Sequence, residues 1–129
     1  MTSLPTMATL HRRVLLVVAL LVHLAVLYAP EVPGSGPMSV PGADKVGHVA
    51  VFALVVAVAL WSGFRVQWVV PVALAHAVVS EVVQHTVLPG RSGDPWDVVA
   101  DVVGVGLGWG LTVALRRRSA VRPPSGPVR

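Results

Sequence analysis

The sequence predicts an all-α membrane protein in which four helices cross the bilayer and pack as a small bundle. Hydrophobic residues make up 54% of the 129 residues and charged residues only 12%, roughly half the share found in soluble domains. The apolar residues fall into four long runs. Each run has about 17 to 23 residues, the length that an α-helix needs to cross ~30 Å of hydrocarbon.

The apolar runs also predict the domain organisation. The expected helices cover residues 13–29, 46–64, 66–88 and 98–115. They form one membrane domain, residues 13–115, between an N-terminal segment (1–12) and a basic, proline-rich tail (116–129) that we expect to be disordered. Valine is abundant and favours strands in water, but runs of this length are too long for soluble strands.

The first run also resembles a signal peptide, since Arg12 and Arg13 precede its apolar stretch. Pro30 directly follows the small residue Ala29, which is a poor context for cleavage. We therefore expect the first helix to be retained.

The basic residues predict how the helices are oriented. With four spans, both termini lie on one side, together with eight arginines: Arg12, Arg13, Arg65, Arg116, Arg117, Arg118, Arg122 and Arg129. The other side holds Lys45 and Arg91. Because basic residues accumulate on the cytoplasmic side, we expect both termini in the cytoplasm. The net charge of +4 then reflects topology rather than binding to nucleic acid.

All acidic residues are expected at the opposite, outer side. They are Glu31, Asp44, Glu81, Asp94, Asp97 and Asp101. Glu81 and Asp101 lie inside apolar runs, where a charge costs on the order of 2.5–3.5 kcal/mol near the bilayer centre. Ionisable residues in such positions face the bundle interior and mark a functional site by default.

The polar residues recur at helical spacing and therefore share faces. These pairs are Asp44 and His48, Glu81 and Gln84, and Asp97 and Asp101. Three helices are thus expected to direct polar side chains into one outer pocket, with Lys45 beside it and Arg91 in the loop above it. Lys45 and Arg91 offer donors to an anion, whereas Glu81, Asp101 and His48 are candidates for acid–base chemistry.

Structural interpretations of the same residues stay open. Asp44 is a possible N-cap, and Asp94 followed by Pro95 has the pattern of an N-cap with proline in the first helical position. Ion pairs of Lys45 or Arg91 with Glu81 or Asp101 would also explain the cluster. The chain has no cysteine and no catalytic or metal-binding motif, so we expect neither a metal nor a cofactor.

Other residues are expected to serve packing. Gly104 and Gly108 form a GxxxG pair, which lets a second helix approach closely and offers a route to a homo-oligomer through the last helix. His23 is expected to be a packed or hydrogen-bonded residue. His76 lies one turn before Ser80 and is a candidate extension of the polar face.

The motifs together resemble the VanZ-like family of bacterial membrane proteins. They are Asp44-Lys45-x-x-His48, Glu81-x-x-Gln84, Pro89-Gly90-Arg91-Ser92 and Asp97-x-x-x-Asp101-x-x-Gly104, spread over residues 44–108. The family often has Asn where this chain has Asp101, which bears on the charge of the pocket. The resemblance implies a multi-pass protein of the bacterial plasma membrane. The founding member of the family is linked to low-level resistance to the glycopeptide antibiotic teicoplanin.

These observations lead to three functional hypotheses. The first is a cell-envelope protein whose outer pocket binds an anionic lipid or a cell-wall precursor group, with teicoplanin tolerance as the associated process. Its predicted ligand-binding residues are Asp44, Lys45, His48, Glu81, Gln84, Arg91, Asp97 and Asp101. The second is a membrane-embedded enzyme in which Glu81 or Asp101 works with His48 as an acid–base pair. The third is a structural or interaction protein of the membrane.

Overall fold

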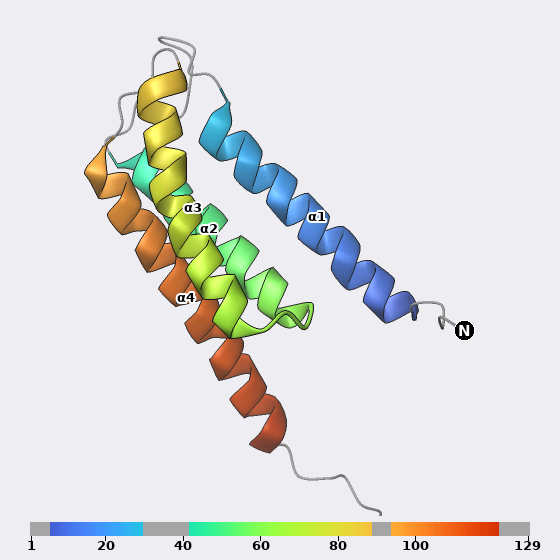
Figure 1. Cartoon of the computed structure of the whole chain (residues 1–129). Coiled ribbons are helices and arrows are strands. Elements are labelled where there is room, and N and C mark those ends of the chain that lie inside the picture. The colour runs from blue at the N-terminus through green and yellow to red at the C-terminus, as the bar shows by residue number, and fades with distance from the viewer. Residues whose placement is uncertain (1–5, 30–41, 89–93, 122–129) are drawn as a thin grey trace, which may run out of the picture.

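Four α-helices make up the described part of the chain in the computed structural model, which covers residues 6–29, 42–88 and 94–121 (Figure 1). They are α1 (Met7–Tyr28), α2 (Ala43–Trp61), α3 (Val66–Val87) and α4 (Pro95–Val121). Each is long and apolar enough to cross a membrane, and the described residues include no strand. The predicted all-α fold with four membrane-spanning helices is thus confirmed.

The first and last helices, α1 and α4, extend beyond the apolar runs that predict them. α1 begins at Met7 rather than at residue 13, because Thr6 caps it: the Thr6 hydroxyl accepts a hydrogen bond from the Thr9 amide at 3.4 Å. α4 continues to Val121 rather than ending at residue 115. Hydropathy marks only the part of a helix that suits hydrocarbon, whereas the helix itself continues where water and headgroups surround polar side chains.

Glycines in the left-handed region shape two connections. Gly63 has φ 99° in the turn between α2 and α3, a conformation that only glycine adopts at no steric cost. Gly42, with φ 82°, is the N-cap of α2. The interpretation of Asp44 as this N-cap is therefore wrong. Asp44 lies in the first turn of the helix instead, where its charge faces the positive end of the helix dipole.

Successive helices run in opposite directions, so the end of each helix lies near the start of the next. The end of α1, the start of α2, the end of α3 and the start of α4 meet at the top of Figure 1, which we call the Pro95 end. The turn from α2 to α3 lies lower in the same view, at the opposite end of these two helices. We call this the Ser62 end.

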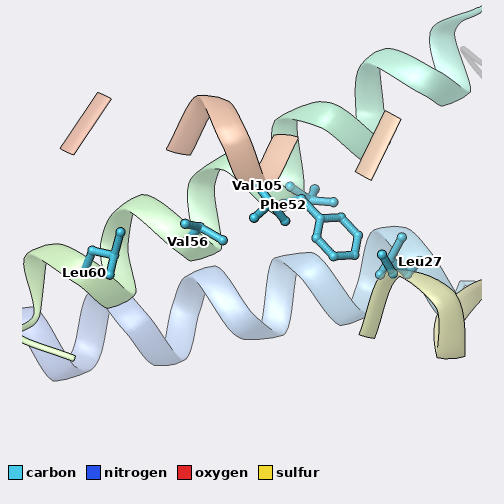
Figure 2. Packing of buried hydrophobic residues seen from close by; sticks show 7 residues of the cluster. Leu27, Phe52, Val56, Leu60 and Val105 are labelled. Carbon is cyan, nitrogen blue, oxygen red and sulfur yellow. The ribbon is translucent and has the colours of Figure 1, made fainter. Parts of the chain in front are cut away.

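The core is small and centred on α2, which packs most extensively against α4 and next against α1. Figure 2 shows Phe52 of α2 near Val105 of α4, with its ring directed toward Leu27 of α1. Many apolar side chains point outward instead, such as Leu21, which is 61% exposed. Within the described ranges, eight polar residues are buried: His23, His48, Ser80, Glu81, Gln84, Asp97, Asp101 and Thr112. Polar groups inside and apolar groups outside are the distribution that lipid surroundings require.

Gly104 and Gly108 lie where α4 approaches α2 most closely. A Cβ atom at Gly104 would lie 2.5 Å from the backbone oxygen of Val49, and one at Gly108 would lie 2.5 Å from that of Ala53. The GxxxG pair thus faces a helix of the same chain. An oligomer formed through α4 would have to use a different face of that helix.

Candidate functional site

Seven ionisable residues gather at the Pro95 end, and we refer to them as the charged cluster. They are Asp44, Lys45 and His48 from α2, Glu81 from α3, Asp94 before α4, and Asp97 and Asp101 from α4. The close approach of α2 to α4 carries their i and i+4 side chains to one place. The cluster therefore unites residues that lie far apart in the sequence.

Lys45 is the centre of the more exposed part of the cluster. Its Nζ donates to Asp44 Oδ2 at 3.1 Å, to Asp94 Oδ2 at 2.8 Å and to Asp97 Oδ1 at 3.2 Å. An ammonium group has three N–H donors, so these carboxylates use all of them. Lys45 thus joins the start of α2 to the start of α4.

Asp94 connects three helices. Its Oδ1 accepts a hydrogen bond from the Trp96 amide at 3.0 Å, which caps α4, and Pro95 takes the first helical position. Its own amide donates to Glu81 Oε1 at 2.6 Å. The hydrogen bond from Lys45 holds the pKa of the Asp94 carboxyl below its ordinary value. Asp94 therefore has a structural role in addition to its charge.

His48 and Asp101 form the buried part of the cluster. His48 Nδ1 lies 2.8 Å from Asp101 Oδ1, and the Asp101 side chain has no exposed surface. The other ring nitrogen, Nε2, lies 4.0 Å from Asp97 Oδ2. The imidazole thus has a carboxylate near each nitrogen, which is an arrangement that can hold or pass a proton.

Gln84, which the sequence predicts on the same polar face as Glu81, makes its hydrogen bond outside the charged cluster. Its Nε2 donates to the backbone oxygen of Leu27 at 2.9 Å. This hydrogen bond ties α3 to the last turn of α1. His85, one residue further on, is exposed, while Arg91, the remaining predicted binding residue, lies outside the described residues.

Two carboxylate oxygens in the cluster are buried without a hydrogen-bond partner among the described residues. They are Glu81 Oε2 and Asp101 Oδ2. An unsatisfied buried polar atom costs free energy and indicates a water, a proton or a ligand group. In the described ranges no three His, Asp or Glu side chains are arranged to hold a metal ion.

A second polar cluster, which sequence analysis did not assemble, lies between α1 and α3. His76 Nδ1 lies 3.1 Å from His23 Nε2, and His76 Nε2 lies 3.2 Å from the Tyr28 hydroxyl. The His23 ring also packs edge-on against Phe52, with centroids 4.6 Å apart. The signal in the sequence was the presence of His23 and His76 deep inside two different apolar runs, because intramembrane polar groups pair with one another.

Together, the apolar exterior, the four spans and the buried ionisable groups define a polytopic helical membrane protein with a charged interior site. The VanZ/LLP1 family model matches residues 5–116 of the 129. The chain therefore belongs to the VanZ/LLP1 family, as the motif resemblance indicated. No match to this chain was found among curated proteins or among solved structures.

Proposed function

We propose that this protein acts at the bacterial cell envelope, as a plasma-membrane protein whose charged cluster binds a polar group of an envelope molecule. Family membership supports the setting. The observation that carries the proposal concerns Glu81, which is 8% exposed and has one oxygen with no hydrogen-bond partner in the part of the chain that the structure describes. A carboxyl group kept inside a membrane bundle with unused hydrogen-bonding capacity is the feature that a purely structural role explains least well.

The charge balance of the cluster bears on the chemistry of the ligand. Its described part has five carboxyl groups and one lysine, and Lys45 already donates to three of those carboxylates. A phosphate or carboxylate ligand would therefore depend on Arg91. Hydroxyl and ammonium groups, which headgroups and cell-wall precursors also carry, suit the free acceptor of Glu81 better.

The test is teicoplanin susceptibility of host cells that express the chain, compared with Glu81→Gln and Arg91→Ala at matched membrane abundance. His85→Gln is the control, because His85 is exposed on the same helix one turn beyond Glu81. We expect the parent and His85→Gln to raise tolerance and Glu81→Gln to lose it. Loss of tolerance in Arg91→Ala as well would indicate that the ligand carries an anionic group. Equal tolerance in the parent and Glu81→Gln would refute a working site at Glu81.

The contact between His48 and Asp101 favours a second candidate, an acid–base enzyme that acts on an envelope lipid. A carboxylate at 2.8 Å from Nδ1 orients the imidazole, and Nε2 would then exchange the proton. Envelope lipids incubated with the purified protein should be converted with a bell-shaped pH dependence, and His48→Gln should abolish the conversion. His11→Gln is the control, since His11 is exposed at the start of α1. An unchanged lipid profile across pH would exclude this candidate.

The same variants distinguish the third candidate, a structural or interaction protein, from a protein with a working site at Glu81. In that case Glu81→Gln would lower abundance or assembly in the membrane, and tolerance corrected for abundance would stay unchanged.

A further inference from the structure

A cavity lies at the Ser62 end, between α1, α2 and α4, and we refer to it as the arginine pocket. It has a volume of about 540 Å³. Its walls include Arg12 of α1, Val58 and Trp61 of α2, and Leu111, Leu115 and Arg116 of α4. The lining thus combines apolar side chains with arginines from two different helices.

Both guanidinium groups are positioned by contacts with α2. The Arg12 guanidinium lies over the Trp61 ring, 5.0 Å from its centroid. Arg116 Nη2 donates to the backbone oxygen of Leu60 at 2.9 Å. Arginine has five N–H donors, so this hydrogen bond leaves most of the donors of Arg116 for a ligand. The Ser62 hydroxyl also donates to the backbone oxygen of Arg12 at 3.3 Å, which holds α1 beside the pocket.

The arginine pocket lacks a counter-charge from the described protein. The acidic residues of the described ranges are Asp44, Glu81, Asp94, Asp97 and Asp101, and all of them belong to the charged cluster at the Pro95 end. The Ser62 end has Arg12, Arg13, Arg65, Arg116, Arg117 and Arg118. Both arginines are exposed, and with no carboxylate of the described residues beside them, the two guanidinium groups that line this cavity offer a site for an anion from outside the chain.

We propose that the arginine pocket binds an anionic phospholipid, with its phosphate between Arg12 and Arg116 and an acyl chain along Leu111 and Leu115. Arginine suits phosphate because its planar donors match the phosphate oxygens. Basic pockets at the ends of membrane helices bind anionic headgroups by this chemistry. The occupant is a lipid rather than free phosphate because the apolar wall belongs to spanning segments of α2 and α4.

The test compares lipid retention by the purified full chain in native mass spectrometry, with phosphatidylglycerol or phosphatidylcholine added at equal amounts. The pocket variants are Arg12→Gln and Arg12→Gln with Arg116→Gln. The controls are Arg13→Gln and Arg13→Gln with Arg117→Gln, which remove the same charge from exposed neighbours that lie outside this pocket. Arg12→Gln spares the hydrogen bond between Arg116 and Leu60, so it remains informative if the double variant fails to fold.

We expect the parent and the controls to retain phosphatidylglycerol in preference to phosphatidylcholine. The double pocket variant should lose more than about tenfold in retention, since it removes the guanidinium donors that would hydrogen-bond directly to the phosphate, whereas the controls remove only charge near the surface. Arg12→Gln should show part of that loss. Equal losses in pocket and control variants would mean diffuse attraction and overturn the proposal. Thermal stabilisation by inorganic phosphate alone, at the concentration of the lipid, would overturn the assignment to a lipid.

Discussion

Lys45 and His48 pair with different carboxyl groups of the charged cluster. Lys45 serves the carboxylates near the helix ends, and its side chain is 36% exposed. His48 serves Asp101 in the interior, where both side chains are at most 5% exposed. Exposed ion pairs contribute little to stability, whereas breaking a buried pair leaves an uncompensated charge. The interior pair should therefore matter more for folding.

Removal of the His48 side chain should reveal this difference. In His48→Ala the Asp101 carboxyl loses its partner while still buried, and we expect the free energy of unfolding to fall by about 3–5 kcal/mol. Asp101→Asn removes the charge and keeps a group that hydrogen-bonds to His48, so its loss should be only about 1–2 kcal/mol. Denaturant unfolding in detergent micelles measures both values. An equal loss of unfolding free energy in His48→Ala and Asp101→Asn would contradict the assignment of these residues as a buried pair.

The ion pair between Lys45 and Asp94 predicts how stability depends on pH. Lys45 lowers the pKa of Asp94 in the folded protein, so Asp94 stays ionised to lower pH than in the unfolded chain, where such a group titrates at about 3.9. The stabilisation is complete above that pH and is lost as pH falls through the folded pKa. Asp94→Asn, which keeps a good N-cap residue, should thus be less stable than the parent near neutral pH. The difference should shrink below about pH 4.

A double-variant cycle is the control for this pH dependence. In a Lys45→Gln background, the stability difference caused by Asp94→Asn should depend on pH much less, because only the hydrogen bond from the Trp96 amide then favours the ionised carboxyl. A pH dependence that is undiminished in this background would assign the effect to a group other than Lys45.

At the scale of elements, the contact between α2 and α4 holds the molecule together. All members of the charged cluster except Glu81 of α3 lie along this pair of helices, as do Gly104 and Gly108. In lipid there is little hydrophobic driving force for helices to associate, so packing contacts matter more. Small residues let the helix backbones approach and so increase the number of these contacts. The same approach places His48 beside Asp101, so packing and the candidate site depend on one interface.

Alanine substitutions on the two glycine faces of α4 should have opposite effects. Gly104→Ala and Gly108→Ala introduce a methyl group 2.5 Å from a backbone oxygen of α2, and each should cost about 1–3 kcal/mol of stability. Gly106→Ala and Gly110→Ala meet open space within this chain and should be neutral or stabilising by up to about 1 kcal/mol through helix propensity. Thermal unfolding in detergent compares them directly. Destabilisation by Gly106→Ala and Gly110→Ala instead would indicate that this second face packs against another molecule.

At the scale of the whole molecule, hydropathy was sufficient to predict the fold class. Length and apolar content predicted the four helices, because the hydrocarbon thickness fixes the length of a spanning segment. Helix ends such as Met7 and Val121 were not predictable in this way, since they depend on caps and on interfacial residues. Gly42 as the N-cap of α2 was missed for a similar reason: its role follows from a left-handed backbone conformation that composition does not reveal.

The sequence predicted which residues of the candidate site share a helix face, but not which residues of other helices they contact. Helical spacing groups Asp44 with His48 and Asp97 with Asp101, yet it does not say which helices touch. The partnership of Gln84 with the Leu27 backbone, and that of His23 with His76, follow from where α1 lies against α2 and α3. Such choices between neighbouring helices depend on packing of the whole bundle, which the periodicity of one helix cannot specify.

The distribution of charge predicts the orientation of the bundle in the membrane. All six arginines of the described ranges lie at the Ser62 end, and basic ends stay in the cytoplasm. The chain has no native cysteine, so single cysteines report on one position each. In intact cells, Ser92→Cys, in the connection between α3 and α4, should react with a membrane-impermeant maleimide. Ser62→Cys should react only after the cells are permeabilised. The reverse pattern would place the charged cluster in the cytoplasm and remove the basis for its contact with an outer envelope ligand.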